Sequence, residues 1–251
     1  MKLPIITISL LISLISYAQE KKEYYPNGNI KSIGACEIYN NGIVAVEAGV
    51  EYNPNLESCT KKGKWKFYYD NGQLQSTGNY TDDEVTGDWK YYYSSGKLNY
   101  TGNYIEGKQH GSWIYYHENG NLAGTHFYDK NKKIGKWKWY FEDGSLESEG
   151  NYSQNIRDGE WKSYFENGQV KSIKNYKKGE EIGKRINYYE SGQLKSIFFL
   201  SGVDKPTPKS EWKIYYESGQ LRVLINIDEH GDPISKIFYK ETGEIQEQKK
   251  Y

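Results

Sequence analysis

Apolar and polar residues alternate in short runs along most of the chain, and a turn dipeptide joins the runs in pairs. In "GKWKFYYDNGQLQSTGNY", from Gly63 to Tyr80, two alternating runs flank Asn71-Gly72. Alternation places successive side chains on opposite faces of a strand, and Asn-Gly is a strong hairpin signal. The segment therefore predicts one β-hairpin.

The hairpin pattern recurs with a period of 24 residues, interrupted once by a step of 27. Repeats of this length are supersecondary units that pack on their neighbours. The glycines that set the period are Gly72, Gly96, Gly120, Gly144, Gly168, Gly192 and Gly219. The pattern predicts an all-β fold: an elongated single-layer antiparallel β-meander of about nine tandem hairpins with a 24-residue repeat.

Interpreting Asn71-Gly72 as a two-residue type I′ loop fixes the register of the hairpin. Tyr69 is then expected opposite Leu74, and Trp65 opposite Gly78, so that large rings face the smallest residues. One face carries a structural aromatic ladder and is expected to be the packed one. The ladder consists of Trp65, Trp89, Trp113, Trp137, Trp161 and Trp212.

The opposite face combines lysine with a recurrent tyrosine that the packing of the tryptophan face does not require. Because exposed tyrosines and lysines can form a binding surface, we interpret this face as the candidate binding face. The alternative is that these tyrosines only satisfy strand propensity and cross-strand packing. The face is formed by Tyr68, Tyr92, Tyr116, Tyr140, Tyr164, Tyr188, Tyr215, Lys66, Lys90, Lys138 and Lys162.

Residues 1–18 have the layout of a secretory signal peptide. "MKLPIITISLLISLISYAQE" has one early positive charge, an apolar run to about Ile15, and small residues before a cleavage site after Ala18. The apolar run is shorter than the roughly 20 residues that a membrane anchor needs. We therefore expect export through the secretory pathway, to the periplasm, the outer surface or the medium. No transmembrane segment is expected in the mature chain.

Cys36 and Cys59 are the only cysteines, and export favours a disulfide between them. Two inert thiols are the alternative. We expect the chain to consist of a signal peptide and four further segments. These are an N-terminal hairpin (19–35), a disulfide-stapled insertion (36–59), regular repeats (60–200), and divergent C-terminal repeats or cap (201–251).

Composition argues against several functional classes. Lys+Arg and Asp+Glu both number 33, so no net field attracts nucleic acid, and we expect no nucleic-acid partner. The chain has no phosphate-binding loop and no nucleophile elbow. The histidines lack metal-ligand spacing: His117 occupies an aromatic position and His126 a glycine position. We predict no enzyme, no catalytic residue, no cofactor and no metal.

The repeat resembles the MORN-type repeat, in the variant form found in bacterial envelope and secreted proteins. The resemblance rests on "GNYIEGKQHGSWIYYHENGNLAG", from Gly102 to Gly124, and covers about residues 60–200 well. It implies a single-layer hairpin array that acts as a protein scaffold or associates with membrane lipid, without catalytic residues. The resulting hypothesis is an exported binding scaffold for a protein partner or the envelope surface.

Two alternatives remain open at this stage. The aromatic hairpins also look like the choline- and glucan-binding repeats of bacterial cell walls, and aromatic cages recognise quaternary ammonium groups or sugar faces. An antitoxin or immunity-type protein that neutralises a toxin is the second alternative. An edge-to-edge homodimer is a further expectation, because an exposed edge strand invites pairing.

Overall fold

The computed structural model describes residues 16–40, 43–46, 49–52, 57–200, 210–228 and 231–251. Nearly all of these residues form strands, and 18 strands make one sheet while β3 and β4 pair separately. No helix within this described part is long and apolar enough to cross a membrane. Most of the predicted signal peptide lies outside the described residues. Strand β1 begins at Ser16, so cleavage after Ala18 would leave the strand beginning at Gln19.

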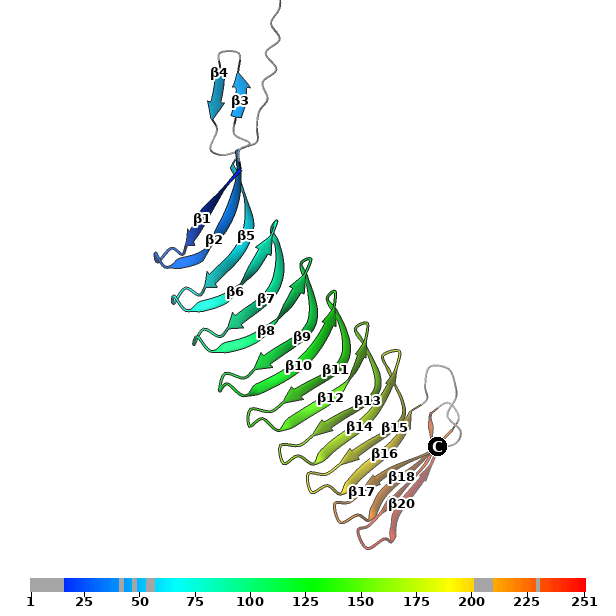
Figure 1. Cartoon of the computed structure of the whole chain (residues 1–251). Helices are drawn as coiled ribbons and strands as arrows, with labels where there is room; N and C mark the ends of the chain where they lie inside the picture. Colours follow the sequence, from blue (N-terminus) through cyan, green and yellow to red (C-terminus); the bar gives the residue numbers. More distant parts are fainter. Residues whose placement is uncertain (1–15, 41–42, 47–48, 53–56, 201–209, 229–230) are drawn as a thin grey trace, which may run out of the picture.

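The strands follow one another in the sheet in chain order, each antiparallel to the last, as the repeat pattern predicts. Figure 1 shows the hairpins stacked like steps, each strand bent along its length. The strands are β1 Ser16–Tyr24, β2 Ile30–Asn40, β3 Ile43–Val46, β4 Gly49–Tyr52, β5 Glu57–Tyr68, β6 Leu74–Thr81, β7 Glu84–Tyr92, β8 Leu98–Ile105, β9 Lys108–Tyr116, β10 Leu122–Asp129, β11 Lys132–Tyr140, β12 Leu146–Ser153, β13 Ile156–Tyr164, β14 Val170–Lys177, β15 Glu180–Tyr188, β16 Leu194–Leu200, β17 Ser210–Tyr215, β18 Leu221–Ile227, β19 Pro233–Tyr239 and β20 Ile245–Lys250.

The Asn-Gly turns differ from the predicted two-residue type I′ loops. Gly72 N–H donates to the Tyr69 carbonyl (3.0 Å), Tyr69 N–H donates to the Gln73 carbonyl (2.8 Å), and Gly72 has a φ of 85°. This is a three-residue loop, in which a turn is followed by a glycine in the left-handed region. The extra loop residue shifts the pairing, so Tyr68, not Tyr69, lies opposite Leu74. The predicted Tyr69–Leu74 pair is therefore wrong.

The two-residue turns with positive φ are found in the connectors between hairpins instead. Asp82 and Asp83 have φ values of 49° and 65°, and Thr81 pairs directly with Glu84. Positive φ at both central residues is the signature of the type I′ turn. The strands of neighbouring hairpins thus continue up to a two-residue turn.

The predicted pairing of Trp65 with Gly78 is confirmed, and Trp137 pairs with Gly150 in the same way. The ring itself, however, leans toward the other neighbouring strand. A Cβ on Gly34 would fall within the indole of Trp65. The same close approach joins Gly78 to Trp89, Gly102 to Trp113 and Gly150 to Trp161. The glycines therefore make room for the tryptophan of the following hairpin.

Tyrosine hydroxyls join several of the hairpins to the next at the turn edge, except in the repeats where Phe141 and Phe165 stand at this position. Tyr69 Oη donates to the Tyr92 carbonyl (2.7 Å), and Tyr93 Oη donates to the Tyr116 carbonyl (2.8 Å). His117 Nε2 makes the equivalent hydrogen bond to the Tyr140 carbonyl. The bonds recur with the repeat and hold neighbouring turns together.

The insertion between the cysteines carries the separate β3–β4 hairpin. Cys36 in β2 and Cys59 in β5 form the predicted disulfide, with their Cα atoms 5.4 Å apart. Cys36 is 1% exposed and packs in a cluster with Trp65. The bridge therefore joins two neighbouring strands of the main sheet at the base of the insertion.

Candidate functional site

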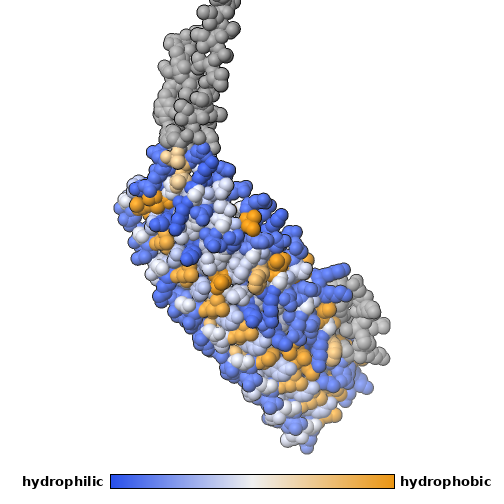
Figure 2. All heavy atoms as spheres, in the orientation of Figure 1, coloured by the Kyte–Doolittle hydropathy of each residue, from blue (hydrophilic) through white to orange (hydrophobic). Residues whose placement is uncertain are grey.

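The sheet has two faces with different chemistry. The Trp face is defined by the aromatic ladder, in which Trp65, Trp89, Trp113 and Trp137 are at most 3% exposed. The Tyr/Lys face is defined by the Tyr68-type column and the Lys66-type lysines named above. Figure 2 shows apolar side chains scattered among hydrophilic ones, with a larger gathering over the C-terminal hairpins.

The tyrosines of the Tyr/Lys face occupy equivalent positions on every second strand. Each is partly exposed and lies opposite the aliphatic residue that follows the turn, as Tyr92 does opposite Leu98. Tyr164 Oη donates to Glu149 (3.2 Å). The other six hydroxyls of the column have no hydrogen-bond partner within the described residues.

The lysines of this face fall into two groups. Lys66, Lys90 and Lys138 have no ion-pair partner within the described parts of the chain, whereas Lys162 pairs with Glu160 (2.8 Å) and Lys213 with Glu211. Hydrogen bonding to Glu160 raises the pKa of Lys162. The part of the face from β5 to β11 therefore presents lysines without an ion-pair partner, whereas Lys162 and the equivalent Lys213 further along the chain are paired.

On the Trp face, the indoles from Trp65 to Trp161 pack edge-on against a tyrosine of the neighbouring strand, whereas Trp212 packs against Phe198. The Trp113 and Tyr104 ring centroids are 5.0 Å apart at 90°, and those of Trp89 and Tyr80 are 5.3 Å apart at 85°. Edge-to-face pairs of this kind add about 0.5–1.5 kcal/mol each beyond the burial of the rings. Lys61 and Lys133 also lie over these aromatic clusters.

His126 takes a glycine position in the ladder, as the sequence indicates. Its ring stacks on Trp137, with centroids 3.9 Å apart at 8°, and it is 8% exposed. A Cβ on Gly124 would contact His126 Nε2, so this glycine makes room for the histidine. Burial, aided by the charge of Lys133, lowers the pKa of His126 to about 4. The neutral ring acts as one more aromatic plate of the ladder.

No group of three or more His, Cys, Asp or Glu side chains that could hold a metal occurs among the described residues. His110 lies beside Asp129 (3.4 Å), and His117 is used at a turn. His230 lies outside the described residues. The described histidines thus serve separate local contacts.

The ladder changes chemistry after Trp161. Lys174 stands at the next glycine position and Arg185 at the next tryptophan position, opposite Phe198. Arg185 pairs with Glu181 through two hydrogen bonds of 2.5 and 2.7 Å. These hydrogen bonds lower the pKa of Glu181. An ion pair therefore replaces the stacked rings at this step of the stack.

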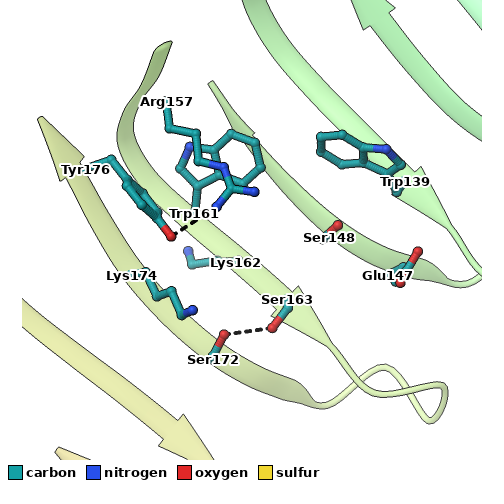
Figure 3. A pocket seen from close by; sticks show the side chains of 10 residues that line it. All are labelled: Trp139, Glu147, Ser148, Arg157, Trp161, Lys162, Ser163, Ser172, Lys174 and Tyr176. Carbon is teal, nitrogen blue, oxygen red and sulfur yellow. Dashed lines mark hydrogen bonds between the residues drawn. The ribbon is translucent and has the colours of Figure 1, made fainter. Parts of the chain in front are cut away.

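An open cavity of about 350 Å³ lies on the Trp face just before this break. Figure 3 shows Trp139 on one side and Trp161, Arg157 and Tyr176 on the other. Ser163 and Ser172, joined by a hydrogen bond, lie nearer the hairpin turn. The sequence prediction missed this cavity. Its signal is the serine at 163, in a column that holds Phe67, Tyr91 and Tyr115 in earlier repeats.

The chain belongs to the MORN repeat variant family, whose model matches residues 20–34, 61–82, 85–106, 109–130, 133–154, 157–178, 181–199 and 210–229. Repeats of this family suggest a binding scaffold. No curated protein matches the chain.

Among solved structures, the chain is similar to parts of toxin-complex proteins. These are a crystal structure of TcdB2-TccC3 (TM-score 0.24) and the Tc holotoxin pore of Photorhabdus luminescens (TM-score 0.25), each 14% identical. Each match covers 93% of this chain but only 14% and 13% of the matched chains.

Proposed function

We propose that this protein is an exported, non-enzymatic scaffold that binds a protein partner through the Tyr/Lys face. The observation that carries the proposal is the contrast between two tyrosine columns. In the first column, which contains Tyr69 and Tyr93, the hydroxyls donate hydrogen bonds within the sheet, as Tyr93 Oη does to the Tyr116 carbonyl (2.8 Å). The hydroxyls of Tyr92 and Tyr116 have no such partner among the described residues.

The chemistry of this face suits a protein surface. Tyrosine is enriched at protein interfaces because its ring buries a large apolar area while its hydroxyl makes a directional hydrogen bond. The column repeats every second strand, or roughly every 10 Å at ordinary strand spacing. A partner can therefore contact several identical tyrosine–aliphatic steps at once. The unpaired Lys66, Lys90 and Lys138 favour an acidic partner surface.

Export and the absence of catalysis are parts of the same proposal. Support for export comes from the signal-peptide layout of residues 1–18 and from the Cys36–Cys59 disulfide, which suits an oxidising compartment. Support for a non-enzymatic role comes from the repetition of acidic residues along the chain. Acidic residues recur at equivalent turn positions, such as Glu118 and Glu142, where turn chemistry accounts for them.

The test is co-sedimentation of the purified protein with envelopes of its source cell. Replacing Tyr92, Tyr116 and Tyr140 together by Ser is expected to abolish binding and leave the β-sheet circular dichroism unchanged. A matched control replaces the exposed connector residues Lys108, Lys132 and Glu180 by Ser, and should bind normally. Unchanged affinity of the tyrosine variant would refute the assignment of this face.

Protease treatment of the envelopes distinguishes the partner classes. We expect shaved envelopes to lose the ability to bind, since the partner is a protein. Binding that survives shaving would instead indicate lipid or glycan, and the protein-scaffold proposal would be wrong.

A further inference from the structure

The cavity on the Trp face exists because Ser163 stands in a column that holds Phe67, Tyr91, Tyr115 and Trp139 in earlier repeats, and because the two neighbouring strands also carry serine beside it. Ser163 pairs with Ser148 on one side and with Ser172 on the other. In the preceding hairpins the equivalent row contains aromatic side chains, including Tyr91 and Tyr100, whose rings stack 4.3 Å apart. The volume that such rings fill is therefore left open here, between hydroxyl groups.

The cavity has aromatic walls. The ring centroids of Trp139 and Trp161 are 5.8 Å apart, and the indoles meet at 38°. Tyr176 packs edge-on against Trp161 with centroids 6.1 Å apart. These walls offer a flat apolar surface to a ligand that also contacts the serine floor.

Two cations line the same cavity without a carboxylate partner. The Arg157 guanidinium lies 4.6 Å from the Trp161 ring and donates to Tyr176 Oη (3.2 Å). Neither Arg157 nor Lys174 makes an ion pair within the residues that the structure describes. Glu181, whose pKa both cations help to lower, is held by Arg185. The cavity thus has a positive end at Arg157 and Lys174, and Glu147, the carboxylate among its lining residues, lies beside Ser148 at the other end (Figure 3).

We propose that this cavity binds a carboxylated sugar, a uronic-acid unit of an acidic saccharide. The carboxylate pairs with Arg157 and Lys174, because a guanidinium presents a planar fork that matches carboxylate geometry. The sugar ring lies against the indoles, and its hydroxyls exchange hydrogen bonds with Ser163 and Ser172.

The same features disfavour two other ligands. A choline-type quaternary ammonium is repelled by the two cations, although aromatic walls would otherwise suit it. A bare inorganic anion would leave the indoles without a contact. The indoles and serines of the site lie on the face opposite the tyrosine column, and Lys162 is the one residue of the Tyr/Lys face among its lining residues. A test of this site with saccharides is therefore independent of the proposed function.

The test measures tryptophan fluorescence and heat of binding on titration with digalacturonic acid. Lactose and inorganic phosphate are the neutral and the purely anionic comparison probes. We expect digalacturonic acid to bind at least tenfold more tightly than either. Arg157→Gln and Lys174→Gln should each weaken its binding several-fold, because each removes one charge from the carboxylate end.

Ser163→Phe is the decisive variant, because it supplies the ring that earlier repeats have in this column. It should fold normally, as judged by circular dichroism, and lose at least tenfold in affinity. Ser163→Ala provides a smaller change if the phenylalanine perturbs the sheet, and should weaken binding by losing a hydrogen bond. Lys133→Gln, the matched change one repeat earlier, should bind as the unaltered chain does.

Three results would overturn the proposal. The first is an absence of binding to digalacturonic acid at millimolar concentration. The second is equal affinity for phosphate, which would make the cavity an anion site only. The third is full affinity in Ser163→Phe, which would place the ligand elsewhere on the protein.

Discussion

The indole of Trp89 lies against the backbone of Gly78 on the neighbouring strand and donates through Nε1 to the carbonyl of Asn79 (3.2 Å). Trp89 is only 2% exposed, although the sheet has a single layer. Because the ring covers the glycine of the preceding hairpin, each tryptophan belongs to two hairpins. This contact therefore links a hairpin to the one that precedes it in the stack.

The first prediction concerns this contact. Gly78→Ala would place a methyl group within the Trp89 ring, and the ring or the strand would have to move. Overpacking of this kind costs about 1–3 kcal/mol. Urea unfolding should show that loss, whereas Thr86→Ala in the next strand should change stability by less than about 0.5 kcal/mol. Equal stability of the two variants would mean that the close approach is not tight.

The second prediction follows from the break in the ladder. Lys174 and Arg185 stand at the positions of a glycine and a tryptophan. Arg185→Trp alone should destabilise, because the new ring meets Lys174 and Glu181 loses its partner. Adding Lys174→Gly should recover part of the lost free energy of unfolding, because a glycine then makes room for the tryptophan as in earlier repeats. A double-mutant cycle should give a favourable coupling of about 1–2 kcal/mol, and additive effects would contradict it.

A third prediction uses the hydroxyl bonds between turns. Tyr93→Phe removes the bond to the Tyr116 carbonyl and should cost about 1 kcal/mol. Phe141 is the equivalent residue two repeats later and lacks a hydroxyl. Phe141→Tyr should therefore gain a similar amount by donating to the Tyr164 carbonyl. The midpoints of thermal unfolding of the two variants should shift in opposite directions. Shifts of the same sign would count against a stabilising role of these hydrogen bonds between turns.

The fourth prediction is a pH dependence caused by His126. The folded pKa of about 4 is below the usual 6.5, so the fold favours the neutral ring. The contribution is fully present above pH 6.5 and is lost as the pH falls toward 4. The free energy of unfolding should drop by up to about 3 kcal/mol over that range. His126→Gly should remove this component, and an unchanged pH profile in the variant would rule out the histidine as its source.

The fifth prediction concerns the disulfide. Cys36 and Cys59 are 23 residues apart, and closing a loop of that length stabilises by about 3 kcal/mol through the unfolded chain. Replacing both cysteines by Ser should lower the urea midpoint by a corresponding amount. The unaltered protein in reducing agent should match the variant. A difference between them would indicate a contribution from the side chains themselves.

The period of the glycines and tryptophans is sufficient to predict the repeat, the strand order and the Trp65–Gly78 register. The turn type was not predictable in the same way. Asn71-Gly72 suits both a two-residue and a three-residue loop, and the φ of Asn71 decides between them. Asp82-Asp83 is a weak turn signal by composition, yet it forms the tight turn.

Other features depend on how side chains lean in three dimensions. The alternation of a strand assigns Trp89 to a face but does not say which neighbouring strand its ring covers. Ser163 reads as an ordinary polar residue in a strand, and its meaning emerges only when its column is compared with Phe67 and Tyr91. The cavity between Trp139 and Trp161 is therefore visible in the structure and not in the local sequence.

The central claim is that the Tyr/Lys face, and not the Trp face, meets a protein partner. Photocrosslinking tests it most directly, with benzoylphenylalanine placed at Tyr92 on one face or at Ser163 on the other, in separate preparations mixed with envelopes. The account predicts a protein adduct from position 92 and none from position 163. A protein adduct from position 163 alone, or from neither position, would contradict it.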